Sequence, residues 1–200
     1  MYLKIENILQ KYTKPIRGVI HVGAHFGEEY NSYIQNGIYE IHFFEASRKT
    51  YEKLVAQVGV ASVYNYALGS CEGEAELFVE SLNQGQSNSL LEPALHLKQY
   101  PQIVFSQREK VNIRQLDYFE IETCNFLNMD VQGFELEVLK GGEKTIDKLD
   151  YVYSEVNRAE TYKNCAQINQ LDEFLLPKGF VRVQTIWAGG IWGDALWVRS

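Results

Sequence analysis

Polar side chains capable of acid–base chemistry follow several apolar runs of strand length in this sequence. They are His25, Glu45, Asp130 and Glu155. The carboxyl ends of parallel strands meet at one edge of a sheet, and ligands bind in the crevice outside that edge. A carboxylate or an imidazole in such a crevice can remove a proton from a bound hydroxyl group. We therefore take these four residues as candidates for one common site.

Several of these residues also have a purely structural interpretation. Asp130 precedes Gly133, so it could face a ligand or cap the next helix. His25 has an ordinary pKa near neutrality and could act as a base, but it could equally pack the turn. Asp130, Glu155 and Asn157 could converge as oxygen ligands for Mg²⁺, or could be solvated loop residues.

The stretch 17–45 has the layout of a nucleotide-binding unit. The apolar run 18–22 leads into a turn with Gly23 and Gly27, and a helical pattern and a second apolar run then end at Glu45. Glycine lets the backbone approach a ligand closely, and free N–H groups at a helix start favour an anionic or carboxylate-bearing ligand. Glu45 can accept hydrogen bonds from both hydroxyls of a ribose. The glycines could instead serve only the turn.

The segment 81–89 is the clearest loop, polar and almost free of charge. Such loops often only connect elements, but neutral donors and acceptors also suit a hydroxyl-rich ligand. Trp187 and Trp192 are expected in a glycine-rich loop and could stack on a sugar ring or an adenine, or simply pack. His21 and His42 lie within apolar runs and are interpreted as core residues. The candidate binding residues of the loop are Asn83, Gln84, Gln86, Ser87, Asn88 and Ser89.

The hydrophobic pattern predicts the strands and helices that would position these residues. Helices are expected over 1–14, 48–57, 90–99 and 168–176, with two more containing 30–34 and 136–139. Strands are expected at 18–22, 41–44, 60–65, 75–80, 111–113, 125–129, 151–154, 180–183 and 195–198. This alternation is typical of an α/β fold with a mostly parallel sheet. We expect one domain over residues 1–200, in which 81–99 forms a substrate loop and a short helix.

Composition narrows the class of protein. A hydrophobic fraction of 46% and an aromatic fraction of 13% indicate a globular chain, and the net charge of −7 without a basic cluster argues against a nucleic-acid partner. The three cysteines Cys71, Cys124 and Cys165 are widely separated, a spacing that suits neither a zinc site nor a disulfide framework, and we interpret them as buried or half-buried thiols. The chain has neither an apolar run of about eighteen residues nor a signal-peptide pattern. A cytoplasmic protein without a membrane span is expected.

Over nearly its whole length the sequence resembles the FkbM type of S-adenosylmethionine-dependent methyltransferase. The most specific match is the segment 130–135, DVQGFE, whose usual form has an acid where Gln132 stands. The first turn usually opens with an aspartate where this chain has His21. The other matching stretches are VIHVGAHFGEE, HFFEAS, NYALGS, NQGQSNSLLEP, VNIRQLDYF, YVYSEVNRAETY and GIWGDALWV.

The resemblance implies a Rossmann-like class I methyltransferase fold, with a seven-stranded mostly parallel sheet and helices on both faces. It also implies S-adenosylmethionine as the cofactor. Its expected binding residues are Gly23, Ala24, His25 and Gly27 in the turn, Glu45 at the ribose, Asn65 and Ala67 near the adenine, and Asp130. Some related enzymes hold a metal with acids at the positions of Asp130 and Glu155, so Mg²⁺ or Mn²⁺ is a further expectation, with Asn157 as a third ligand.

We therefore expect an O-methyltransferase that acts on a sugar hydroxyl of a glycan or glycoside. Such a hydroxyl must be oriented and must lose its proton, so Asp130, His25 and Glu155 are the candidate catalytic residues. The loop residues from 83 to 89 and Trp192 would recognise the rest of the small-molecule or glycan acceptor. The alternatives are a non-sugar secondary metabolite as acceptor, a non-catalytic module that binds the cofactor, and an NAD-dependent oxidoreductase. The oligomeric state is left open.

Overall fold

A computed structural model describes residues 4–59, 61–188 and 190–200. The helices are α1 (Ile5–Lys11), α2 (Tyr30–Gln35), α3 (Arg48–Val58), α4 (Leu95–Gln99), α5 (Glu135–Lys140), α6 (Glu143–Ile146) and α7 (Ile168–Leu175), with short 3₁₀ turns at Leu116–Phe119 and Leu176–Lys178. The strands are β1 (Val19–Val22), β2 (Ile41–Phe44), β3 (Ser62–Tyr64), β4 (Ala67–Leu68), β5 (Gly73–Val79), β6 (Gln107–Arg114), β7 (Phe126–Met129), β8 (Tyr151–Asn157), β9 (Phe180–Ala188) and β10 (Trp192–Arg199). Within the described ranges, every helix is too short or too polar to cross a lipid bilayer.

Seven strands form a large sheet in the order β3-β2-β1-β7-β8-β10-β9. In this sheet the five neighbouring strands β3, β2, β1, β7 and β8 are parallel to one another. Strand β10 runs antiparallel to both β8 and β9. This confirms the expected seven-stranded, mostly parallel sheet. Chain order reverses at β1, which lies between β2 and β7, and a ligand crevice forms at the carboxyl ends of strands at such a point.

Each face of the large sheet has its own hydrophobic core, because successive strand residues point to opposite faces. Ile20, Leu127 and Val152 pack on one face with apolar residues of α5, α6 and α7. Val19 and Phe126 pack on the other face with residues of α1, α2 and α3. The helices are therefore divided between the two faces, as the methyltransferase resemblance implied.

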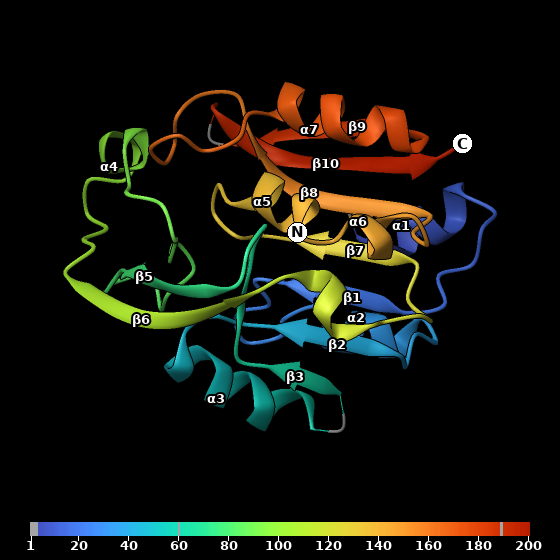
Figure 1. Cartoon of the computed structure of the whole chain (residues 1–200), viewed down its shortest axis with the longest axis horizontal. Helices are drawn as coiled ribbons and strands as arrows, with labels where there is room; N and C mark the ends of the chain where they lie inside the picture. The colour runs from blue at the N-terminus through green and yellow to red at the C-terminus, as the bar shows by residue number, and fades with distance from the viewer. Residues whose placement is uncertain (1–3, 60, 189) are drawn as a thin grey trace.

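A second, three-stranded sheet has the order β4-β6-β5. In Figure 1, β10 ends at the C label on the right. Because β10 is antiparallel to β8, the carboxyl ends of the parallel strands lie on the left, where β5, β6 and α4 are drawn. The strand predicted at 75–80 thus belongs to this small sheet. The strand predicted at 111–113 extends over the whole of β6, and β4 was not predicted.

Several predicted boundaries were wrong by a few residues. The first helix is shorter than 1–14, and its first three residues lie outside the described part, as do 60 and 189. Strand β8 continues through Glu155 to Asn157, because β10 pairs with it along that length. Both Trp187 and Trp192 lie within the paired strands β9 and β10, so neither belongs to a loop.

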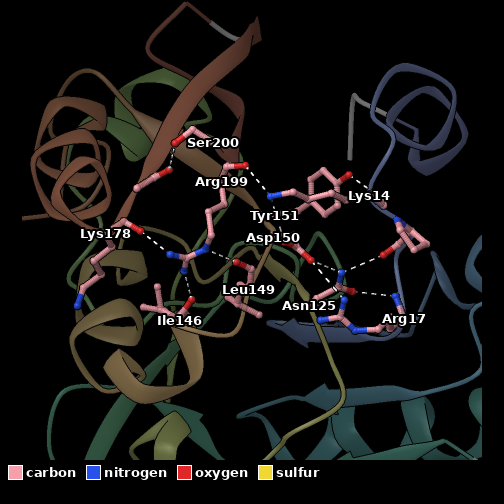
Figure 2. Close-up of polar contacts among 12 residues, drawn as sticks. Lys14, Arg17, Asn125, Ile146, Leu149, Asp150, Tyr151, Lys178, Arg199 and Ser200 are labelled. Atoms are coloured by element: carbon pink, nitrogen blue, oxygen red, sulfur yellow. Dashed lines mark hydrogen bonds and ion pairs between the residues drawn. The ribbon is translucent and has the colours of Figure 1, made fainter.

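Polar contacts close the sheet at the end opposite the predicted site (Figure 2). The guanidinium group of Arg199 donates to three backbone oxygens at 2.6 Å each, those of Leu149, Lys178 and Ile146. Asp150 forms ion pairs with Lys14 at 3.4 Å and Arg17 at 3.5 Å, and accepts a hydrogen bond from Asn125 at 2.7 Å. Lys14 Nζ also donates to the carbonyl oxygen of Arg199 at 3.0 Å, and this bond joins the last strand to the segment that precedes β1.

Candidate active site

A cavity of about 760 Å³ opens at the carboxyl ends of β1, β2, β7 and β8. The loop after β5, the helix α4 and the start of β10 complete its wall. The predicted site residues that line it are Gly23, Ala24, His25, Glu45, Ala67, Asn83, Gln86, Ser87, Asn88, Ser89, Asp130, Glu155 and Trp192. Gly27, Asn65, Gln84 and Asn157 are outside the cavity lining.

Gly23 brings the turn after β1 against the backbone at the end of β7. Its φ is +76°, and a Cβ at this position would lie 1.8 Å from the carbonyl oxygen of Asp130. Its N–H donates to the carbonyl oxygen of Phe44 at 2.9 Å. Only glycine allows both the left-handed backbone and the close approach of the two chain segments. The cavity floor therefore depends on this residue.

Gly27 has a packing role in the turn after β1. A Cβ on Gly27 would lie 2.8 Å from atoms of both Leu54 and Val58, so the glycine lets the turn pack against α3. Its contact with a cofactor stays a prediction.

Glu45 lies at the end of β2 with both carboxylate oxygens facing backbone donors. Oε2 accepts from the N–H of His25 at 3.0 Å, and Oε1 accepts from the N–H of Ser47 at 2.9 Å. Burial raises the pKa of Glu45 to about 7, although these two hydrogen bonds oppose the shift. Asn65 donates to the carbonyl oxygens of Glu45 and Ala46, both at 2.9 Å. Asn65 therefore holds the segment after β2 from behind the cavity wall.

His25 connects the turn after β1 to the loop after β5. Its φ is +49°, its Nδ1 lies 2.7 Å from Glu28 Oε1, and its Nε2 lies 3.0 Å from the carbonyl oxygen of Gln84. Burial alone would lower the pKa of His25, but these hydrogen bonds and the charges of Glu28 and Glu45 outweigh it and raise the pKa. A carbonyl oxygen only accepts, so Nε2 must carry a proton. With both ring nitrogens engaged, His25 is better placed as a positively charged link than as a general base.

The two acids at the ends of β7 and β8 are joined by one amide group. Gln132 Nε2 donates to Asp130 Oδ1 at 2.7 Å and to Glu155 Oε2 at 3.0 Å. Gln132 Oε1 accepts from the Tyr162 hydroxyl at 2.7 Å, and the same hydroxyl contacts the carbonyl oxygen of Ser87 at 3.0 Å. This network positions both acids and ties them to the substrate loop.

The environment favours the protonated form of both acids. Burial raises the pKa of Asp130 to about 6, and the charge of Asp194 adds to the effect while Gln132 opposes it. Because Asp130 is exposed to the open cavity, water screens part of this shift. Burial and the neighbouring charges of Asp130 and Glu135 hold the pKa of Glu155 well above its ordinary value. Asp130 can therefore take up a proton near neutral pH.

The backbone of the turn 130–135 fixes the positions of Asp130 and of Gln132, which holds both acids. Gln132 has a φ of +54° and Gly133 a φ of +101°, and a Cβ on Gly133 would lie 2.7 Å from Cys165. Glu135 Oε1 accepts from the N–H groups of Val131 and Gly133, both at 3.1 Å. The buried Glu135 carboxylate therefore stabilises a turn in which two successive residues have a left-handed conformation.

The substrate loop folds around the buried carboxylate of Glu80. This group accepts from the N–H of Leu82 at 2.7 Å, of Asn83 at 2.6 Å, and of Gly85. The Asn88 side chain accepts from the N–H of Glu80 at 3.0 Å. The loop is thus an ordered wall of the cavity.

One wall of the cavity was predicted only in part, since Ser87 and Trp192 were candidates but His96, Tyr100 and Thr161 were not. Trp192 Nε1 donates to the Tyr100 hydroxyl at 2.9 Å, and His96 Nε2 lies 3.2 Å from Ser87 Oγ. Thr161 also lines the cavity, and its carbonyl oxygen accepts from the N–H of His96 at 3.0 Å. For His96, Tyr100 and Thr161, the one signal in the sequence was the helical spacing around His96.

His21 and Asn157 are both buried close to the site. His21 Nδ1 lies 3.3 Å from the Tyr33 hydroxyl and its Nε2 lies 3.1 Å from Asn128 Nδ2, so His21 has the satisfied core contacts that were predicted. Burial lowers the pKa of His21. Asn157 is fully buried and lies outside the cavity lining, and its expected role as a metal ligand stays a prediction.

The chain was compared with known proteins. It is 31% identical over 118 residues to the 2-O-methyltransferase NoeI of Sinorhizobium fredii, a match that covers 55% of this chain and 46% of that protein. The structure of methyltransferase FkbM from Methylobacillus flagellatus KT superposes with a TM-score of 0.59 at 14% identity, covering 92% of this chain and 43% of that one. Magnesium protoporphyrin IX methyltransferase from Synechocystis, solved with bound SAM, gives a TM-score of 0.52 at 8% identity, with coverage of 98% and 76%.

This chain thus spans less than half the length of NoeI and of the Methylobacillus protein. The two structural similarities, at such low identity, establish the shared fold. The family model of the methyltransferase FkbM domain matches residues 21–182, which is well over half of the sequence. The chain therefore belongs to the FkbM methyltransferase domain family.

Proposed function

We propose that this protein is an S-adenosylmethionine-dependent O-methyltransferase whose acceptor is a sugar hydroxyl of a glycan or glycoside. The observation that carries the proposal is the acid pair Asp130 and Glu155, held by Gln132 in the cavity beside the Gly23 turn. The family and the fold imply the cofactor.

The residues around the Gly23 turn suit the cofactor. The close backbone approach at Gly23 leaves no side chain over the cavity floor, and Glu45 lines the cavity at the end of β2. Glu45 would hold the ribose, and Ala24 and Ala67 would lie against the rest of the nucleoside. When bound, S-adenosylmethionine supplies an electrophilic methyl group on a sulfonium centre. The ionised form of the Asp130 carboxylate would favour this cation.

Asp130 is our candidate general base. A sugar hydroxyl is a weak nucleophile until its proton is removed in the transition state, and a carboxylate whose pKa is raised toward neutrality is a stronger base than an ordinary one. Gln132 would fix the direction of the Asp130 carboxylate, which takes up the proton of the acceptor hydroxyl, and Glu155 would orient the acceptor. His25 would position the loop through Gln84.

The acceptor would occupy the part of the cavity formed by the substrate loop, α4 and Trp192. The loop offers neutral amide and hydroxyl groups, and Trp192 offers an aromatic surface, a combination that suits a polyhydroxylated ring. The name of the relative NoeI, a 2-O-methyltransferase, agrees with oxygen as the methylated atom. A non-sugar metabolite with several hydroxyls is the second candidate, favoured by the same neutral groups.

Mg²⁺ or Mn²⁺ at Asp130 and Glu155 is left out of the proposed mechanism. The Gln132 amide nitrogen, which is a hydrogen-bond donor and no metal ligand, lies between the two carboxylates at 2.7 and 3.0 Å. A cation bound to both acids would have to displace it. The expected third ligand, Asn157, is outside the cavity lining.

The first test combines binding and transfer. Isothermal titration calorimetry with S-adenosylhomocysteine, with and without Mg²⁺ or Mn²⁺, should show saturable binding that is independent of metal. Methyl transfer to a panel of oligosaccharides is then followed by mass spectrometry. For Asp130→Asn we expect transfer to fall by about a hundredfold or more, the usual scale of general-base loss, with cofactor affinity nearly unchanged.

Glu76→Gln is the control, because Glu76 is an exposed acid of β5 away from the cavity lining. Full transfer by Asp130→Asn would refute the role of the base. Binding without transfer to any hydroxyl acceptor would favour the non-catalytic module, and absence of cofactor binding would refute the proposal as a whole.

A further inference from the structure

Three side chains that commonly bind metals meet at the amino ends of β2 and β7. The cavity lies at the other end of these strands. Glu40 precedes β2, His42 is its second residue, and Cys124 lies two residues before β7. One potential ligand atom of each side chain lies within 4.8 Å of the other two. The nitrogen His42 Nε2 and the oxygen Glu40 Oε1 are already 2.9 Å apart.

The groups around these side chains resemble the outer shell of a metal site. The second ring nitrogen of His42, Nδ1, lies 3.2 Å from the Tyr64 hydroxyl, and the two rings are nearly parallel. Thr123 Oγ1 donates to Glu40 Oε1 at 3.3 Å. In metal sites the free nitrogen of a ligating histidine usually has such a partner, which fixes the ring and leaves the other nitrogen for the metal.

The backbone keeps space for the sulfur atom. A Cβ on Gly18 would lie 2.8 Å from Cys124 Sγ and 2.9 Å from the carbonyl oxygen of Glu40. The same carbonyl oxygen accepts from the N–H of Val19 at 2.9 Å, so both segments are fixed to the start of β1. Cys124 is almost completely buried, whereas half of the Glu40 side chain is exposed. The cluster thus has a buried sulfur and an open side that faces water.

We propose that Glu40, His42 and Cys124 bind one Zn²⁺ ion. The ligands would be a thiolate, a neutral imidazole nitrogen and a carboxylate, with water completing a tetrahedron on the exposed side. Thiolate and carboxylate together supply two negative charges, which match the charge of the ion. On binding, the Cys124 S–H bond breaks, a Zn–S bond forms, and the proton passes to solvent.

The ion would act as a structural link. Glu40 and Cys124 are 84 residues apart in the chain, and the ion would join the segments that lead into two strands of the large sheet. Both strands contribute cavity residues at their other ends, Glu45 after β2 and Asp130 after β7. The ligands are a mixed set from separate segments, so no cysteine spacing in the sequence could have indicated this site.

Zinc binding to the chelator-treated full chain tests the proposal. We expect calorimetry to show one equivalent of Zn²⁺ bound with micromolar or tighter affinity, and a rise in melting temperature. Cys124→Ser and His42→Gln should each weaken binding at least about tenfold, a loss typical of altered metal sites. Cys71→Ser is the matched control, because Cys71 is a free, exposed cysteine elsewhere, and it should bind like the wild type.

Substitution with Co²⁺ identifies the ligand directly, because a bound thiolate gives a sulfur-to-cobalt absorption band in the near ultraviolet. This band should be present in the wild type and in Cys71→Ser and absent from Cys124→Ser, whose folding is checked by circular dichroism. Absence of saturable Zn²⁺ binding to the wild type would overturn the proposal. Undiminished binding to Cys124→Ser would also overturn it, and so would loss of binding in Asp130→Asn, which would place the ion in the cavity.

Discussion

The buried carboxyl of Glu135 gives a quantitative test of the electrostatics around the acid pair. Glu135 is 1% exposed, and burial raises its pKa from 4.5 to about 7, although the N–H groups of Val131 and Gly133 oppose the shift. Glutamine keeps the oxygen that accepts both hydrogen bonds and removes the charge. Glu135→Gln therefore changes the electrostatics of the turn while its hydrogen bonds are retained.

The sign of the effect follows from proton uptake. Between pH 4.5 and 7 the unfolded chain has an ionised Glu135 and the folded chain holds the proton, so the free energy of unfolding falls as pH rises. At about 1.4 kcal/mol per tenfold change in proton affinity, the loss approaches roughly 3 kcal/mol above pH 7. Glu135→Gln should remove this loss. The variant should match the wild type near pH 4 and be more stable than it by about 2–3 kcal/mol at pH 8.

Urea unfolding followed by tryptophan fluorescence at pH 4, 5, 6, 7 and 8 measures this difference. The reasoning is refuted if the stability difference between variant and wild type is the same at every pH, or if it shrinks as pH rises.

Three further predictions concern the backbone, the closing polar contacts and the loop. Gly23→Ala should weaken S-adenosylhomocysteine binding more than tenfold, as measured by calorimetry. Gly37→Ala is the control and should leave binding intact. The φ of Gly37, +77°, matches the +76° of Gly23, but open space surrounds Gly37. Arg199→Leu removes donors from three carbonyl oxygens and should cost about 3 kcal/mol in urea unfolding, with a loss under 1 kcal/mol refuting the role of these bonds. His25→Ala should speed amide exchange in the loop 81–89, and unchanged exchange would contradict the link through Gln84.

The large sheet could be predicted because its signals are local. The strands β1, β2, β7 and β8 are apolar runs bounded by glycine turns or acids, and such runs are typical of strands buried on both faces. The ends of these strands then indicated Glu45, Asp130 and Glu155 as neighbours. The family model and the seven-stranded sheet confirm that interpretation of the fold.

The second sheet and one cavity wall could not be predicted in this way. The alternating pattern at 75–80 suits any half-exposed strand, and β5 pairs with β6 through residues that are 28 to 40 positions apart in the chain. The wall formed by Trp192 and Tyr100 joins residues 92 positions apart. Periodicity within a segment identifies an element but contains no information about which distant element it meets.

The roles of His25 and Gln132 show why site chemistry was harder to predict than site location. His25 has the right pKa for a base, but its partners Glu28 and Gln84 leave it no free nitrogen, and Gln84 is 59 residues away. Gln132 stands where an acid is usual, and its amide donates to both Asp130 and Glu155. An acid in its place would add a third carboxylate and remove the donor that holds the pair. A glutamine here is therefore consistent with a cavity that positions its acids by hydrogen bonds.

The variant Gln132→Glu should distinguish an acid pair held by a hydrogen-bond donor from an acid pair that can bind a metal. If Gln132→Glu creates Mg²⁺-dependent cofactor binding or transfer, the acid pair is a latent metal site, whereas loss of transfer with or without Mg²⁺ would support the amide as the positioning group.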